Sequence, residues 1–324
     1  MTADLVGPVG YAGFFLVMAL LNGLVCLGLN VQWGQTGLFN VGVAGFVAIG
    51  AYMSALLTTP PSEGHIGGYS FPIVLGWMGA IVAAGGVSTA VGALTLRLRA
   101  DYLAITTFGV AIVVQLIALN AQRLTGGAFG IAFIPRPFEE LSSSPALYNL
   151  ANLGLVAGIV LAIFVALERL ARSPWGRVLR AIREDERAAM AVGKSPTRFR
   201  LQAFALGGAL MGLAGAMEAH FIGFIAPENY QSSLTFQVWA MLIVGGSGNN
   251  LGALLGAAIV WALWTVSGLV ISDLVPAAYE ARAAALRLVA IGVLLATMIV
   301  ARPRGLIGER SLVSRHVAGA DGSP

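Results

Sequence analysis

The sequence predicts an all-α, polytopic transmembrane helical bundle of about nine spans, with eight to ten as the range. The 324-residue chain is 57% hydrophobic and only 10% charged, and its mean hydropathy is +0.83. Soluble domains average about 25% charged residues. The apolar residues form repeated runs of about 20, the length at which a helix crosses a bilayer. We therefore expect one membrane domain at 1–305, followed by a disordered tail at 306–324.

Nine apolar runs define the expected spans. They cover residues 10–30, 38–58, 71–96, 102–121, 151–168, 199–220, 233–245, 251–272 and 285–301. The second and seventh runs are the least regular, because the glycine-rich segments 34–45 and 245–252 could be broken or re-entrant. Irregular backbone is tolerated at membrane depth only where it is buried in protein or lines a cavity.

The basic residues orient these spans. Most of the 19 fall on one face of the bundle: Arg97, Arg99, the nine from Arg169 to Arg200, Arg302, Arg304, Arg310 and Arg315. The opposite face receives only Arg123, Arg136, Arg282 and Arg287. Cytoplasmic loops are enriched in Lys and Arg. The richer face is therefore expected to be cytoplasmic, which puts the N-terminus outside and the C-terminus inside.

The longest charged passage lies between the fifth and sixth spans and predicts an amphipathic helix over about 174–193. Ser173 and Pro174 are suited to an N-cap and a first helical turn, and Gly193 to the residue after a helix end. Its apolar residues fall roughly on one stripe: Val178, Ile182, Ala189 and Val192. A solvated loop helix that only satisfies the charge bias is the simpler interpretation of this passage taken alone.

Catalytic and metal-binding patterns are not found in the sequence. His65, His220 and His316 are far apart and share no ligand spacing with the single cysteine, Cys26. The tail of a phosphate-binding loop occurs at 193–195, but Ala188 stands where its first glycine belongs and no strand precedes it. We expect no enzymatic activity, no metal and no cofactor, and the membrane spans argue against a nucleic-acid partner.

The predicted spans are poor in ionisable residues and rich in glycine and amides. Glu218 is the only ionisable candidate for mid-membrane, and its place near the outer end of its span beside His220 favours an interfacial carboxylate. Six amides lie in or next to spans: Asn22, Asn30, Gln35, Asn40, Gln115 and Asn120. Each is best interpreted as a helix–helix contact. Together with 42 glycines they would also suit a path for a small polar or zwitterionic solute.

Three stretches carry a family resemblance. The first reads QWGQTGLFNVG at 32–42 and continues as AIGAY at 48–52; the second reads LRADYLAITT at 98–107, followed by LTGG at 124–127. The third reads GRVLRAIREDE at 176–186 and runs to Gly193, continuing at 205–217 and ending as GGSGN at 245–249. Together they cover most of 30–260. The chain resembles the LivM-type permease subunit of branched-chain amino acid ATP-binding-cassette (ABC) importers.

The resemblance implies that helix 174–193 is a coupling helix, docked in a groove of an ATP-hydrolysing subunit. The residues expected to couple are Arg177, Arg180, Arg183, Glu184, Arg187 and Gly193. The residues expected along the substrate pathway are Gln35, Asn40, Gly42, Gly45, Gly126, Gly127, Gly245 and Gly246. We expect Gln35 and Asn40 to offer hydrogen bonds to the solute.

The resemblance also implies the setting. Such a permease moves branched-chain or related amino acids into the cytoplasm by alternating access, driven by a partner ATPase. Its partners are a homologous permease subunit, two cytoplasmic ATPase subunits, an extracytoplasmic solute-binding protein and the lipid of a bacterial cytoplasmic (inner) membrane. An importer for urea, short amides or aromatic acids is an alternative. A stand-alone secondary transporter is less well supported, because the sequence shows no inverted repeats.

Overall fold

A computed structural model describes residues 3–61, 66–96, 100–274 and 305–308, together with isolated positions between 279 and 301. Across these residues the chain is helical, with one isolated bridge between Ile131 and Ile225 as the only extended pairing. Six of the described helices are long and apolar enough to cross a membrane. The prediction of a helical membrane bundle is confirmed.

Eight apolar helices build the described bundle. They are α1 (Ala3–Leu29), α2 (Val43–Thr58), α3 (Ile73–Thr95), α4 (Ala100–Asn120), α6 (Pro145–Arg172), α9 (Pro196–Ile222), α10 (Ser232–Gly245) and α11 (Asn250–Leu274). The connecting segments contain η1 (Asn30–Gly34), α5 (Gln122–Thr125), η2 (Gly127–Phe129), η3 (Glu139–Leu141), α7 (Pro174–Glu184), α8 (Glu186–Ala191) and η4 (Pro227–Tyr230). Each of the first eight predicted spans overlaps one of the apolar helices. The ninth, 285–301, and nearly all of the tail lie outside the continuously described residues.

Two of the apolar helices are short. α2 has 16 residues and α10 has 14, so they rise about 24 and about 21 Å, less than the roughly 30 Å of a hydrocarbon core. The predicted start of the second span at Leu38 is wrong, because the chain between Gln35 and Gly42 is irregular. Gly37 takes a left-handed conformation (φ +73°), and the Asn40 side chain accepts a hydrogen bond from the Gly42 amide at 2.8 Å. These two features hold the irregular segment in place.

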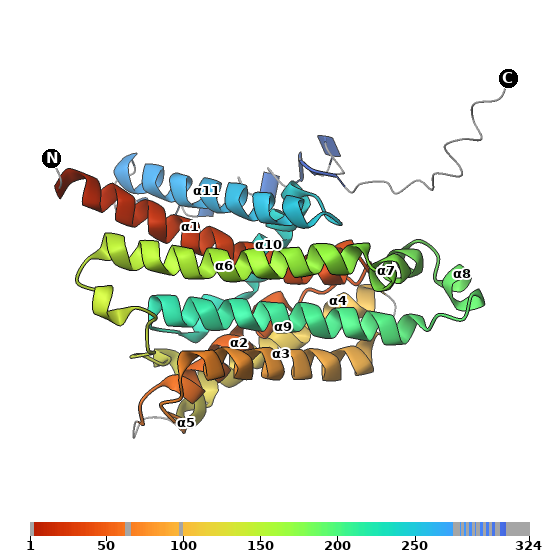
Figure 1. Cartoon of the computed structure of the whole chain (residues 1–324), viewed down its shortest axis with the longest axis horizontal. Coiled ribbons are helices and arrows are strands. Elements are labelled where there is room, and N and C mark those ends of the chain that lie inside the picture. The colour runs from red at the N-terminus through yellow and green to blue at the C-terminus, as the bar shows by residue number, and fades with distance from the viewer. Residues whose placement is uncertain are drawn as a thin grey trace.

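The helices are layered around α1 and α9. The most apolar windows of these two helices are 72% buried, against 22 to 28% for the other four long helices, which leaves large outward faces for lipid or a partner. α1 contacts α6, α9 and α11, and α9 contacts α2 and α3. A Cβ atom on Gly50 would collide with the backbone of Gly212, so small residues set the close approach of α2 and α9. Figure 1 shows the long helices side by side, with α7 and α8 beyond one end.

The predicted helix over 174–193 is two helices rather than one. α7 ends at Glu184, Asp185 is extended (φ −148°, ψ 103°), and α8 begins at Glu186. The Asp185 carboxylate accepts hydrogen bonds from the amides of Arg187 (2.9 Å) and Ala188 (3.0 Å), the geometry of an N-cap. The prediction of one continuous helix overlooked this cap. Ser173 occupies the N-cap position of α7, as predicted, but its hydroxyl donates to the carbonyl of Leu170 at 2.6 Å and makes no capping hydrogen bond to α7.

Candidate functional site

The arginines of α7 bind the ends of the helices beside it. Arg177 Nη1 donates to the carbonyl of Arg172 at 3.2 Å, and Arg180 Nη2 donates to the carbonyl of Ala171 at 3.1 Å. Both acceptors belong to the last turn of α6, where carbonyls have no partner within the helix and carry the negative end of its dipole. Two predicted coupling residues are thereby engaged inside this chain.

Arg183 makes the corresponding contact to α1. Its Nη1 donates to the carbonyl of Gly34, the last residue of the π-helix that continues α1. Its Cγ would lie 3.2 Å from a Cβ atom on Gly37, so the side chain follows the turn beyond η1. On the underside of α7, Leu179 and Ile182 are buried. α7 is therefore fixed across the ends of two membrane helices.

The other predicted coupling residues lie on an outward face. Glu184, Arg187 and Gly193 are all exposed, and Gly193 has the left-handed conformation (φ +76°) expected after a helix end. Two apolar side chains share this face, because Met190 is 50% and Val192 is 73% exposed. The placement of Val192 on a packed stripe was wrong. We call Glu184, Arg187, Met190, Val192 and Gly193 the outward face of α7–α8.

A polar network joins three helices near α7. Asn30 Nδ2 donates to Asn250 Oδ1 at 2.9 Å, and Asn250 Nδ2 donates to Glu168 Oε2 at 3.1 Å. Glu168 in turn pairs with Arg172 at 2.6 Å, and the Gly248 amide donates to Asn30 Oδ1 at 2.8 Å. The network connects η1, α6 and α11 at the end of the bundle that carries α7.

The predicted pathway amides are packed into the protein. Asn40 is completely buried, and its Nδ2 donates to Gln32 Oε1 at 2.7 Å. Gln32 Nε2 then donates to the carbonyl of Phe204 in α9 at 2.8 Å. Gln35 is 4% exposed. In this conformation the amide of Asn40 serves as a contact between elements, the interpretation that the sequence favoured for any single amide.

The predicted pathway glycines lie at three separate places. Gly42 and Gly45 face α4, where added Cβ atoms would lie 2.6 Å from the carbonyl of Thr107 and 2.8 Å from the Cα of Ala111. Gly126 and Gly127 form left-handed turns after α5, and Gly245 and Gly246 end α10. The structure does not bring these six together, and none of them lines the cavity between α1, α9, α10 and α11.

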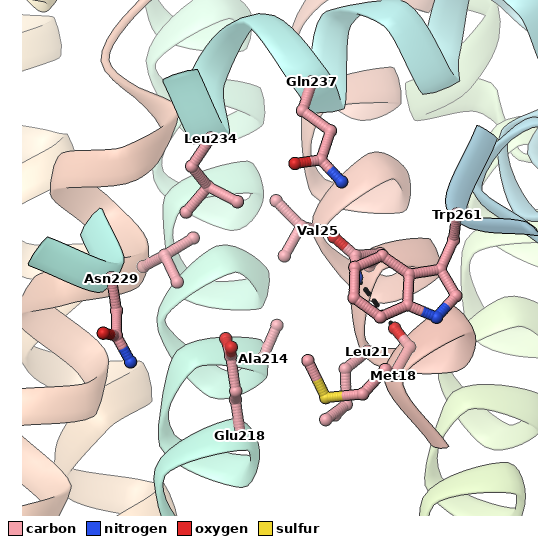
Figure 2. Close-up of a pocket in the computed structure, with 11 residues that line it drawn as sticks. Met18, Leu21, Val25, Ala214, Glu218, Asn229, Leu234, Gln237 and Trp261 are labelled. Carbon is pink, nitrogen blue, oxygen red and sulfur yellow. Dashed lines mark hydrogen bonds between the residues drawn. The ribbon is translucent and has the colours of Figure 1, made fainter. Parts of the chain in front are cut away.

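That cavity has a volume of about 220 Å³ and contains the Glu218 carboxylate. Three amide side chains line it with Glu218: Asn22 from α1, Asn229 from η4 and Gln237 from α10. Figure 2 shows the Glu218, Asn229 and Gln237 side chains around one space, with Val25, Leu234 and Trp261 as apolar wall. Asn229 is exposed, so this side of the cavity reaches the surface.

Glu218 and His220 have separate surroundings. His220 is completely buried, with Nε2 2.8 Å from Ser54 Oγ and Nδ1 2.7 Å from the carbonyl of Pro135. Among the described residues, the Glu218 carboxylate has no hydrogen bond or ion pair. It lies four residues before the end of α9, a depth of about 6 Å. Glu218 therefore lies near one end of α9, as the sequence predicted, in a cavity wall between helices.

Tyr230 on η4 is close enough to Glu218 to be affected by its charge. Burial raises the pKa of the Tyr230 phenol well above its ordinary value, and the negative charge of Glu218 adds to this effect. The Tyr230 ring lies 6.1 Å from that of Tyr52 in an edge-on arrangement. The hydroxyl therefore stays protonated. Among the described residues, no group of three His, Cys, Asp or Glu side chains has the geometry to hold a metal ion.

A comparison with protein families matches residues 11–300 to the family described as branched-chain amino acid transport system, permease component. The chain belongs to this family of permeases. No solved structure matches it significantly.

Named relatives place the permease more closely. It is 37% identical over 265 residues to the high-affinity branched-chain amino acid transport system permease protein LivM of Salmonella typhimurium, covering 75% of this chain and 60% of the relative. It is 29% identical over 320 residues to the probable branched-chain amino acid transport permease protein LivM of Methanocaldococcus jannaschii, covering 90% and 91%. An autoinducer 2 import system permease protein, LsrC of Escherichia coli, is 31% identical over 173 residues, or 52% of this chain and 48% of the relative. The permease thus spans about 60% of the first of these relatives.

Sequence reasoning missed two structural features of this permease. Asn250 and Glu168 were not selected, and the network that joins them to Asn30 bridges 220 and 82 residues of sequence. The cavity was missed as well, although Asn22 and Glu218 had been singled out separately. Their signal was polarity inside an apolar run, which shows that a side chain needs a polar environment but not where it points.

Proposed function

We propose that this permease is the membrane subunit of an ABC importer that carries branched-chain amino acids into the cytoplasm. The family match over residues 11–300 carries the proposal, and the LivM names of two relatives point to this solute class. The importer would contain a homologous permease subunit, two ATPase subunits and an extracytoplasmic binding protein. Its membrane is the bacterial cytoplasmic membrane, with the C-terminus inside.

The geometry of α7 and α8 supports a mechanical role within this proposal. Closure of the ATPases would push on the outward face of α7–α8, which offers exposed Met190 and Val192 beside Glu184 and Arg187. Hydrophobic side chains exposed beside charges are typical of a surface that meets a partner. The contacts of Arg180 and Arg183 would pass this displacement to α6 and α1 as a rigid-body movement. The six coupling residues thus divide into three that face the ATPase and three that anchor α7.

Uptake by the reconstituted complex tests the proposal. The permease, tagged at one end, is purified from membranes of its host with its co-purifying subunits and inserted into liposomes that contain ATP. The expected result is accumulation of labelled leucine, isoleucine or valine that requires ATP inside and the binding protein outside. Urea, acetamide and an aromatic amino acid serve as competitors. Uptake of one of these in place of branched-chain amino acids would assign a different solute, and uptake without ATP would contradict an ABC importer.

A further inference from the structure

The cavity of Glu218 is built like a binding site. An ionisable group in a membrane helix is costly, and it usually faces a partner or a water-filled space with a function. Among the described residues, the Glu218 carboxylate accepts no hydrogen bond and forms no ion pair, and it borders a cavity. The amide groups of Asn229 and Gln237 also have no hydrogen-bond partner among the described side chains. Three polar groups therefore converge with unused hydrogen-bonding capacity.

The arrangement matches the parts of a small zwitterion. A carboxylate accepts hydrogen bonds from an ammonium group, whereas amide N–H groups donate hydrogen bonds to a carboxylate. Glu218 provides the first function, and Asn229 and Gln237 provide the second. The apolar wall of Val25, Leu234 and Trp261 suits an aliphatic side chain. A volume of about 220 Å³ suits one small molecule.

We propose that this cavity is a transit site for the amino acid, in which Glu218 binds the α-ammonium group and Gln237 and Asn229 bind the α-carboxylate. The inference rests on the proposed function, since it assumes that an amino acid is the solute. The exposed Asn229 marks the entrance, at the end of α9 opposite α7. The solute would enter there from the binding protein and be released towards α7 when the helices rearrange.

Helix packing is the competing explanation of these polar residues. Asn22 illustrates it, because its Nδ2 donates to the carbonyl of Met18 at 2.9 Å within its own helix. Glu218 has no such contact in the described structure. If Glu218 were only structural, replacement by the isosteric Gln would leave ligand recognition unchanged. If it binds ammonium, the same replacement removes the charge that the ligand needs.

Protection of an introduced thiol measures binding directly. Leu234→Cys places a reactive group in the cavity wall and keeps all three proposed polar ligands, and the one native cysteine, Cys26, is buried. The purified complex without binding protein is treated with a maleimide in the presence of leucine, 4-methylpentanoate, which lacks the ammonium group, or acetamide. We expect leucine to slow the modification and the other two to have little effect. Adding Glu218→Gln should weaken protection by leucine about tenfold or more, because a charge-assisted hydrogen bond is lost.

Uptake into liposomes provides the second measurement, with Glu228→Gln as a matched control. Glu228 is exposed, lies on η4 next to Asn229 and does not line the cavity. We expect Glu218→Gln to lose leucine uptake at least tenfold, Glu218→Asp to retain part of it and Glu228→Gln to match the unmodified complex. If the unmodified complex transports no branched-chain amino acid, the proposed function fails. If it transports leucine, but Glu218→Gln does so equally or leucine protects no better than 4-methylpentanoate, the transit site is overturned. Should Glu218→Gln not assemble, the comparison of ligands on Leu234→Cys alone decides the question.

Discussion

The guanidinium of Arg183 donates a hydrogen bond to the carbonyl of Gly34, which joins α7 to the π-helix at the end of α1. α1 and α9 form the buried centre of the bundle, and α1 also contributes Asn22 and Val25 to the Glu218 cavity. A displacement of α7 would therefore act on a helix that lines the proposed transit site. The contact provides a physical route between ATPase and solute.

Replacement of Arg183 tests this route. Arg183→Glu removes the donor and places a carboxylate against the negative end of η1, so it should separate ATP hydrolysis from transport. We expect the ATPase to co-purify at the ordinary level while leucine uptake falls about tenfold or more, since a charged hydrogen bond contributes about 1.5 to 3 kcal/mol. Arg183→Lys is the control and should retain part of the uptake. Loss of the ATPase from Arg183→Glu would show instead that this arginine belongs to the docking surface.

Substitutions on the outward face of α7–α8 should, unlike Arg183→Glu, weaken binding of the ATPase. Met190→Glu and Arg187→Glu alter side chains that point away from the bundle, so insertion and folding should be normal while the ATPase binds more weakly. Hot-spot side chains at the centre of an interface, Arg among them, contribute about 2 kcal/mol or more, roughly a 30-fold change in affinity. Lys194→Glu, also exposed, is the control for charge alone. Co-purification of the ATPase with both outward variants at full yield would leave α7–α8 as a solvated loop.

Sequence reasoning located the helices better than the contacts between them. Apolar runs found eight helices because a span must satisfy its backbone internally, so its length and composition are local properties. The break at Asp185 also had a local signal, an N-capping residue before Glu186, which was overlooked because Gly193 offered a later end. Pairs such as Asn30 and Asn250 had no local sequence signal, because their contact depends on which helices become neighbours. The same limit explains why Glu218 was noticed but its cavity was not.

The Asn30–Asn250 pair should couple energetically. Removing either side chain leaves a buried donor or acceptor unpaired, which costs about 1 to 3 kcal/mol in each single variant. The double variant Asn30→Leu/Asn250→Leu should lose less unfolding free energy than the sum of the losses in the two single variants. The difference, the coupling free energy, should lie between about 0.5 and 2 kcal/mol. Thermal unfolding of the four proteins in one detergent measures the cycle. Strict additivity would mean that the pair contributes nothing in the assembled protein.

Gly45 should resist even a small side chain. A Cβ atom there would lie 2.8 Å from the Cα of Ala111, so Gly45→Ala must push α2 away from α4 at a cost of about 1 to 3 kcal/mol. Gly109 on α4 is the matched control, since nothing lies within 4 Å of an added Cβ atom there. We expect a lower melting temperature for Gly45→Ala only. Equal melting temperatures would show that the two helices separate easily, and Gly45→Trp would then test whether this face borders the solute path.

The orientation of the bundle can be tested with reporters on either side of α6. Its 28 residues cross the membrane between the loop at 139–144 and the start of α7, so fusions after Ser143 and after Ala191 should report opposite sides. The excess of basic residues around α7 predicts a cytoplasmic reporter after Ala191 and an extracytoplasmic one after Ser143. A third fusion, after Asn229, should agree with Ser143, because the Ile131–Ile225 bridge holds the loops that precede α6 and follow α9 at one end of the bundle. The reverse pattern would put α7–α8 outside, where no ATPase could reach it, and would direct the entrance of the Glu218 cavity to the cytoplasm.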